Sequence, residues 1–327
     1  MSASQRNPYL RSVGLILLVT IVTSLMAQEA LRDPSVLREV HLIIADKKGH
    51  SLDDIKQDEI QITEEGKAQT VDSFSMLDLP VRYGLVIDNS GSLRTQFSKV
   101  VELARSIVES KKPEDQVFIV RFVSSDEINT TQETTSDKSQ LLTALGTLQP
   151  GGKGQTALID AVYLSAEKLL KPAGVDPQAT HRRAIVLISD GEDRNSFYNE
   201  EQLIKILQKG NIKVFVIALV KELDRDGGLR RLAPRDRAIK FVEGLARETG
   251  GRAFFPHKPE DFSNALMQIA HDLHLQYVLK YYSTSGKKKN PKIEIKLSDG
   301  PEKSKRKAIF QPRYAGNELY QANDKKP

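Results

Sequence analysis

Cysteine and tryptophan are both absent from the 327 residues of this chain. Without cysteine there is no disulfide, no thiolate metal ligand and no cysteine nucleophile, so the sequence says nothing about the redox state of its compartment. Long apolar runs are also scarce. The apolar stretch at residues 13–22 is shorter than the roughly 18 residues that a membrane-spanning helix needs. Hydrophobic residues make up 39% and charged residues 28%, which argues against a disordered chain and against a multispan membrane protein. We therefore expect a folded body with one large and one smaller domain.

Neither sign of charge is in large excess. Against 43 acidic residues there are 48 Lys and Arg, a net charge of +5, which is too small to indicate a nucleic-acid partner. Basic residues gather near the C-terminus: Lys287, Lys288, Lys289, Lys292, Lys296, Lys303, Lys305, Arg306 and Lys307. A solvated face explains such a run. The alternative is contact with anionic lipid or envelope polymers, which high salt should abolish.

The N-terminus has the layout of a signal peptide. Arg6 and Arg11 precede the apolar stretch 13–22, and small residues follow as far as Ala27. We predict that residues 1–27 form a signal peptide, although Leu25 is a poor residue for the third position before the cut. An uncleaved N-terminal anchor is the alternative. Either way we expect an exported protein, periplasmic or extracellular.

Two segments show the alternation of apolar and polar residues that is typical of β-strands. The first covers residues 34–76 and the second residues 276–313. Because domain termini often lie close together, we predict that the two segments pair into one small flanking β domain. Residues 314–327 read as a polar tail.

The middle of the chain, residues 81–273, follows a different pattern. Four near-continuous apolar runs are expected to be strands covered on both faces: 81–87, 117–122, 184–188 and 212–220. Segments with apolar residues at helical spacing separate them. Strands that alternate with helices indicate an α/β fold, a Rossmann-like, doubly wound and mostly parallel sheet.

Oxygen-bearing side chains follow the ends of these predicted strands. They are Asp88, Ser90 and Ser92 after the first run, Asp190 after the third, and Thr156 behind a glycine-rich stretch that leads into a helix. In open α/β sheets the carboxyl ends of the strands form the ligand site. Two carboxylates and three hydroxyls suit a hard cation, so we expect Mg²⁺, with Mn²⁺ or Ca²⁺ as alternatives. Few protein ligands leave coordination positions open for an external carboxylate.

These segments, in this order, resemble the metal-ion-dependent adhesion site of the von Willebrand factor type A family. The resemblance implies that Ser90 and Ser92 touch the metal directly, while Thr156 and Asp190 exchange between direct and water-mediated contact. The flanking β segments, including Gln276 to Tyr282, are similar to exported VWFA-related proteins of acidobacteria and similar bacteria. The resemblance implies a non-enzymatic module of the bacterial envelope that binds a protein ligand presenting Asp or Glu.

Two other functions are open to such a chain. One is a metal-independent structural scaffold, since Asp and Ser after a strand also serve as ordinary helix caps. The other is a Mg²⁺-dependent phosphoryl-transfer hydrolase with an aspartate nucleophile. A haloacid-dehalogenase-like phosphatase would carry a second aspartate two residues after Asp88, where this chain has Ser90, and residues 151–156 lack the spacing of a Walker loop.

Two weaker metal patterns read as structural. His257, His271 and His274 lack a further ligand at helical spacing, so a surface or packing role is expected for them. The stretch Asp224 to Gly228 lacks the closing glutamate of a calcium loop, and the charged segment 221–237 is predicted to be a solvated loop at the rim of the site.

Overall fold

The computed structural model describes residues 37–47, 49–152, 154–171, 181–223, 232–286, 290–298 and 305–310. The predicted signal peptide and polar tail lie outside the described residues. Within the described ranges, no helix is both long enough and apolar enough to cross a membrane.

A six-stranded sheet forms the centre of the larger part of the molecule, in the order β10-β9-β8-β5-β6-β7. Its strands are β5 (Val81–Asp88), β6 (Gln116–Phe122), β7 (Ile128–Thr135), β8 (Arg182–Ser189), β9 (Ile212–Ala218) and β10 (Arg252–Phe254). Strand β7 runs antiparallel to β6, and the other neighbouring pairs are parallel. The predicted mostly parallel α/β sheet is confirmed.

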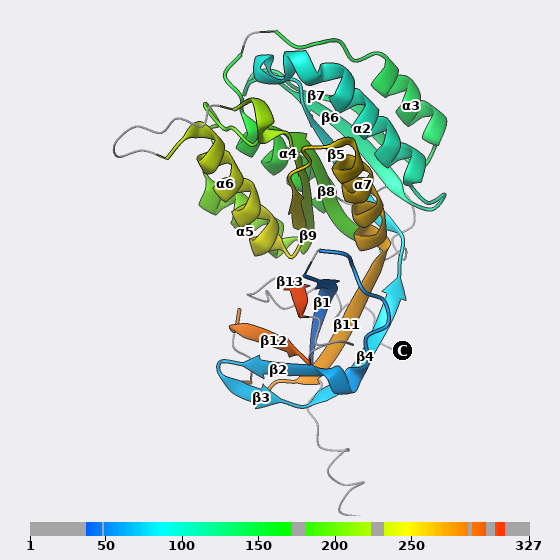
Figure 1. Ribbon diagram of the computed structural model, residues 1–327, viewed down its shortest axis with the longest axis vertical. Coiled ribbons are helices and arrows are strands. Elements are labelled where there is room, and N and C mark those ends of the chain that lie inside the picture. The colour runs from blue at the N-terminus through cyan, green and yellow to red at the C-terminus, as the bar shows by residue number, and fades with distance from the viewer. Residues whose placement is uncertain are drawn as a thin grey trace, which may run out of the picture.

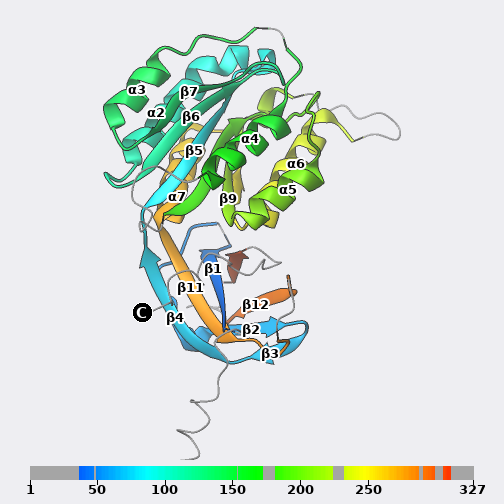
Figure 2. The same cartoon turned by 180° about the vertical axis from the view of Figure 1, so that it is seen from behind.

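Helices cover both faces of this sheet (Figures 1 and 2). One face carries α2 (Phe97–Ser110), α3 (Lys138–Gly146) and α7 (Pro259–His274), and the other carries α4 (Leu158–Leu170), α5 (Glu200–Lys209) and α6 (Pro234–Thr249). In β5, Leu85 and Ile87 join the first core and Val86 joins the second. The strand sequences are apolar almost without interruption because alternate side chains are buried on opposite faces. We call residues 81–274 the α/β unit.

Antiparallel sheets flank this unit, and we call them the β unit. One has the order β13-β1-β11-β4 and the other the order β12-β2-β3. Their strands are β1 (Leu37–Asp46), β2 (Ile60–Glu64), β3 (Lys67–Gln69), β4 (Val71–Asp78), β11 (Leu275–Tyr282), β12 (Ile293–Leu297) and β13 (Arg306–Phe310). The beginning and the end of the described chain meet here, for example where Val40 of β1 pairs with Leu279 of β11.

Two connections join the units at the amino-terminal edge of the central sheet. Strand β4 leads into β5, and α7 leads into β11. At the second connection, His274 is 4% exposed and its Nε2 lies 2.7 Å from a carboxylate oxygen of Asp115. Asp115 also accepts a hydrogen bond from the main chain of Val81, the first residue of β5. One buried carboxylate therefore fixes both connections, and His274 has the packing role expected for it.

Part of the chain departs from the sequence-based expectation. Strand β7 and helix α3 were not predicted, because β7 is a polar edge strand that lacks a buried face. The segment 221–237 is not a loop throughout, since η4 (Val220–Glu222) and the first turn of α6 occupy its described ends. Pro234 begins α6 because its fixed φ and missing N–H suit the first position of a helix.

Candidate metal centre

The candidate site lies at the carboxyl ends of β5 and β8 and at the start of α4. Asp88 is the last residue of β5, and Asp190 follows Ser189, the last residue of β8. Because β5 begins at the connection to the β unit and runs away from it, the site is at the opposite edge of the central sheet (Figure 1). All five predicted residues except Ser92 are buried, with exposures of 0 to 3% for Asp88, Ser90, Thr156 and Asp190.

Asp88 is held in place by two hydrogen bonds, one from the turn that follows β5 and one from the end of β8. The main-chain N–H of Ser90 donates to Oδ1 at 2.9 Å. The hydroxyl of Ser189 donates to Oδ2 at 2.6 Å, and this hydroxyl in turn accepts from the N–H of Gly191 at 2.9 Å. Both oxygens of the carboxylate therefore have fixed directions.

A chain of hydroxyls links the first motif to the second aspartate. The hydroxyl oxygens of Ser90 and Ser92 lie 3.0 Å apart. The Ser92 hydroxyl donates to Oδ2 of Asp190 at 2.6 Å, while the N–H of Glu192 donates to Oδ1 of Asp190 at 3.0 Å. Side chains 98 residues apart in sequence thus contact one another.

Thr156 comes to the same edge through its main chain. Its carbonyl oxygen accepts hydrogen bonds from the N–H groups of Arg194, at 2.8 Å, and Asn195, at 3.2 Å. These residues follow Asp190 in the segment between β8 and α5. Four of the predicted residues, Asp88, Ser90, Ser92 and Asp190, are therefore linked by hydrogen bonds that involve their side chains. The fifth, Thr156, is bound through its main chain to the loop that follows Asp190.

Comparison with protein families gives a match at residues 84–246, to the von Willebrand factor type A domain. This chain contains a von Willebrand factor type A (VWA) domain. The matched residues run from β5 into α6, and they include all five residues of the candidate site.

Solved structures resemble the fold at low sequence identity. BatB from Bacteroides thetaiotaomicron is 19% identical with a TM-score of 0.43, covering 59% of this chain and 98% of its own. A VWA protein from Catenulispora acidiphila is 11% identical with a TM-score of 0.46, covering 89% and 77%. The manganese-loaded TRAP protein of Plasmodium vivax is 15% identical with a TM-score of 0.42, covering 70% and 82%. The comparison with curated proteins found no match.

The two aspartates of the candidate site are buried, and burial disfavours their ionised form. Burial, and after it the charge of Asp190, raises the pKa of Asp88 to about 7, against the opposing effect of the hydrogen bonds from Ser189 and Ser90. Burial likewise raises the pKa of Asp190, against the hydrogen bond from Ser92. The nearby cation Arg194 forms an ion pair with Glu192. A cation would stabilise the ionised form of two adjoining buried carboxylates, so the donor set fits a cation.

Two glycines allow the backbone to close around the site. A Cβ on Gly151 would lie 1.8 Å from the carbonyl oxygen of Asn89, so only glycine fits against the first motif. Gly191 has a φ of 80°, which is in the left-handed region that favours glycine. It turns the chain directly after Asp190, so that the N–H of Glu192 can reach the Asp190 carboxylate.

Three supporting residues were missed by reasoning from the sequence. Ser189 orients Asp88, and Asn89 joins the first motif to the glycine-rich stretch by donating to the carbonyl of Gln149 and accepting from the N–H of Gly151, each at 2.9 Å. Asp160, in the first turn of α4, binds the main chain of the β8–α5 segment. Ser189 and Asn89 lie beside predicted ligands, so their position was a usable signal, whereas nothing in the sequence distinguishes Asp160.

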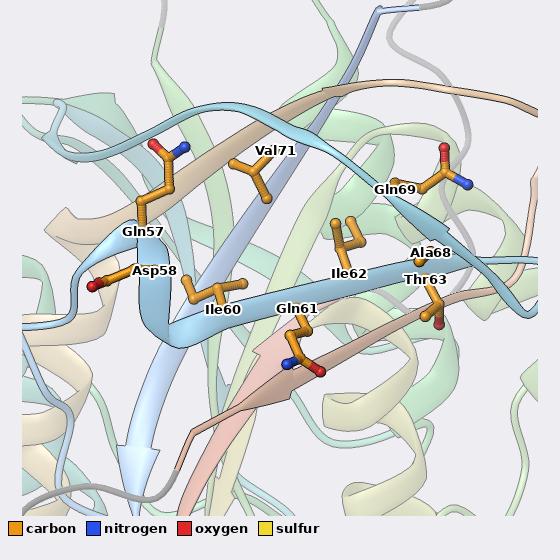
Figure 3. Close-up of a pocket in the computed structure, with 9 residues that line it drawn as sticks. All are labelled: Gln57, Asp58, Ile60, Gln61, Ile62, Thr63, Ala68, Gln69 and Val71. Carbon is orange, nitrogen blue, oxygen red and sulfur yellow. The ribbon is translucent and has the colours of Figure 1, made fainter.

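No group of three or more His, Asp or Glu side chains in the described ranges could hold a metal. A cation at the candidate site would therefore need hydroxyl ligands from Ser90, Ser92 or Thr156 in addition to the two carboxylates. A separate open groove of about 470 Å³ lies in the β unit, away from this site (Figure 3). It is lined by residues of η2 (Gln57–Glu59), β2, β3 and β4, and Asp58 is its acidic residue.

Proposed function

We propose that this protein is a divalent-cation-dependent protein-binding module of the bacterial envelope. Asp88, Ser90, Ser92, Thr156 and Asp190 would hold Mg²⁺, with Mn²⁺ or Ca²⁺ as alternatives. The bound cation would supply a Lewis-acidic position that accepts a carboxylate from an Asp or Glu of the partner. The family type supports a protein-interaction role, and we propose that the module binds its partner without catalysing a reaction.

The observation that carries this proposal is the link between Ser92 and Asp190. The Ser92 hydroxyl lies 2.6 Å from a carboxylate oxygen of the buried Asp190 and 3.0 Å from the Ser90 hydroxyl, so three side-chain oxygens that could bind a cation lie together. The Asp88 carboxylate is held beside them by Ser189. This is an all-oxygen donor set, the kind that Mg²⁺ prefers over zinc.

The proposed location rests on the N-terminal sequence pattern, which predicts export. In the described part of the basic C-terminal region, Lys292 pairs with Glu294 and Arg306 pairs with Glu59. Lys287, Lys288, Lys289 and Lys303 lie outside the described residues. Contact of this region with an anionic envelope surface remains a prediction, to be tested by the loss of binding to anionic vesicles at high salt.

Calorimetric titration with MgCl₂ tests the cation site. We expect wild type to bind one Mg²⁺, Asp190→Ala to lose affinity by at least about 100-fold, and Asp54→Ala to bind as wild type does. Asp54 is an exposed carboxylate of the β unit and is the matched control. Circular dichroism would verify that Asp190→Ala is folded.

The same titration separates the alternatives. Wild-type protein that is folded and binds no Mg²⁺, Mn²⁺ or Ca²⁺ would make the chain a metal-independent scaffold. Mg²⁺-dependent turnover of p-nitrophenyl phosphate that Asp88→Asn abolishes would make it a hydrolase. Binding of the blocked peptide Gly-Ser-Asp-Ser-Gly in Mg²⁺, and its loss in EDTA, is the result expected of an adhesion module.

A further inference from the structure

Phe197 is exposed to an unusual degree for an aromatic residue. Its side chain is 85% exposed, whereas the other exposed large hydrophobic residues of the described chain range from 38% for Leu37 to 64% for Met267. Isolated exposed hydrophobic residues are common on protein surfaces and have no meaning by themselves. What distinguishes Phe197 is where it lies and how firmly its backbone is held.

Phe197 belongs to the segment 190–199, which begins with the predicted ligand Asp190. The segment returns to the site where the N–H groups of Arg194 and Asn195 donate to the carbonyl of Thr156. The hydroxyl of Ser125, in the β6–β7 loop, donates to the carbonyl of Asn195 at 2.6 Å. Phe197 thus comes two residues after a direct contact with the loop that carries Thr156.

The backbone at Phe197 is fixed by a buried carboxylate. Asp160 is 4% exposed and lies in the first turn of α4, four residues after Thr156. Its two oxygens accept hydrogen bonds from the N–H groups of Phe197 and Tyr198, each at 2.9 Å. Its own N–H donates to the hydroxyl of Ser196 at 3.1 Å. The same turn of helix that follows Thr156 therefore determines where Phe197 is presented.

The rings around Phe197 form a small aromatic platform on the α4 side of the site. The ring of Tyr198 meets that of Phe197 edge-on, with centroids 5.4 Å apart, and stacks on Tyr163 of α4 at 3.6 Å. Tyr163 and Tyr198 are half-buried, so they support the platform while Phe197 stays in solvent. A partner that covers Phe197 would bury apolar area without having to order the loop first.

We propose that Phe197 determines which partner binds. Its ring would contact an aliphatic side chain of the partner, such as leucine, next to the acidic residue that reaches the cation. This inference rests on the proposed function and defines its partner class. The cation would take the carboxylate, and Phe197 would take the neighbouring apolar side chain. An apolar contact beside a charged one also shields the latter from water.

Two blocked peptides test the proposal, with the full chain in Mg²⁺: Gly-Leu-Asp-Leu-Gly and Gly-Ser-Asp-Ser-Gly. We expect wild type to bind the leucine peptide about three to ten times more tightly, because one apolar side chain is buried against Phe197. Phe197→Ser should bind the two peptides equally, and Phe197→Leu should keep part of the preference. Met267→Ser, which removes an exposed hydrophobic residue from α7, is the matched control and should keep all of it.

Each other outcome has a definite meaning. Equal binding of the two peptides by wild type, or a preference that survives Phe197→Ser, overturns the role of Phe197 and leaves the cation site intact. Failure of both peptides to bind wild type in Mg²⁺ removes the proposed function, and the inference with it. A wild-type dimer in sedimentation that Phe197→Ser converts to monomer would show that a second copy of this chain covers the ring, which also overturns the proposal.

Discussion

In the metal-free protein, the loss of a proton from folded Asp88 should lower the stability as the pH rises. The folded-state pKa of Asp88 is raised from 3.8 to about 7, chiefly by burial and then by the charge of Asp190. Between these two values the folded state holds a proton that the unfolded state has released. The contribution of Asp88 to the free energy of unfolding must therefore fall as the pH rises from about 4 to about 7, and this contribution should be constant above that.

The gap between 3.8 and about 7 corresponds to about 4 kcal/mol of stability lost across this window. Other groups titrate there too, for example His41, whose pKa is lowered, mainly by burial. Comparison with Asp88→Asn removes the contribution of groups such as His41 that lie outside the Asp88–Asp190 pair. The difference between the two proteins therefore reports the titration of this pair.

The assay is urea unfolding in EDTA at several pH values between 4 and 8, with both proteins. The stability of wild type should fall relative to Asp88→Asn as the pH rises, and saturating Mg²⁺ at pH 8 should restore wild type alone. Parallel pH profiles for the two proteins would refute the reasoning, since Asp88 would then hold no proton that depends on folding.

Three further results are expected. Gly151→Ala, which would place a Cβ 1.8 Å from a main-chain oxygen, should cost about 1–3 kcal/mol in urea unfolding, whereas Gly152→Ala, with no atom within 4 Å, should cost less than about 0.5 kcal/mol. His274→Ala removes the imidazole that pairs with the buried Asp115, which keeps only main-chain donors, and should cost about 3–5 kcal/mol, while His257→Ala, at an exposed side chain, should be nearly neutral by the same measurement. Mg²⁺ at about 100 times its dissociation constant should raise the free energy of unfolding by about 2.7 kcal/mol, and EDTA should reverse this gain.

The central sheet could be predicted because its strands are covered on both faces. Burial on both sides leaves near-continuous apolar runs such as 184–188, and these are hard to mistake. The residues after each run then marked the carboxyl edge where the structure brings Ser92 and Asp190 together. Strand β7 carries little such signal, because it is a polar edge strand. Helix α3 was overlooked because it is short and buries only Leu141, Ala144 and Leu145.

The supporting contacts of the site were harder to foresee, because they depend on side chains that meet only after folding. Ser189 contacts Asp88, 101 residues earlier, and Asp160 binds the main chain of residues 37 and 38 positions later. An isolated serine or aspartate carries no periodicity that could reveal such a partner. The pattern of the strands therefore identifies the predicted ligands, while their orientation requires the packed structure.

Anomalous diffraction from crystals soaked in MnCl₂ tests the central claim most directly, because manganese takes the same oxygen ligands as magnesium and can be located without a structural assumption. We predict one strong peak bounded by the hydroxyls of Ser90 and Ser92 and by the Asp88 and Asp190 carboxylates. A soaked crystal with no peak at this edge of the sheet, or with manganese only elsewhere on the surface, would contradict the account.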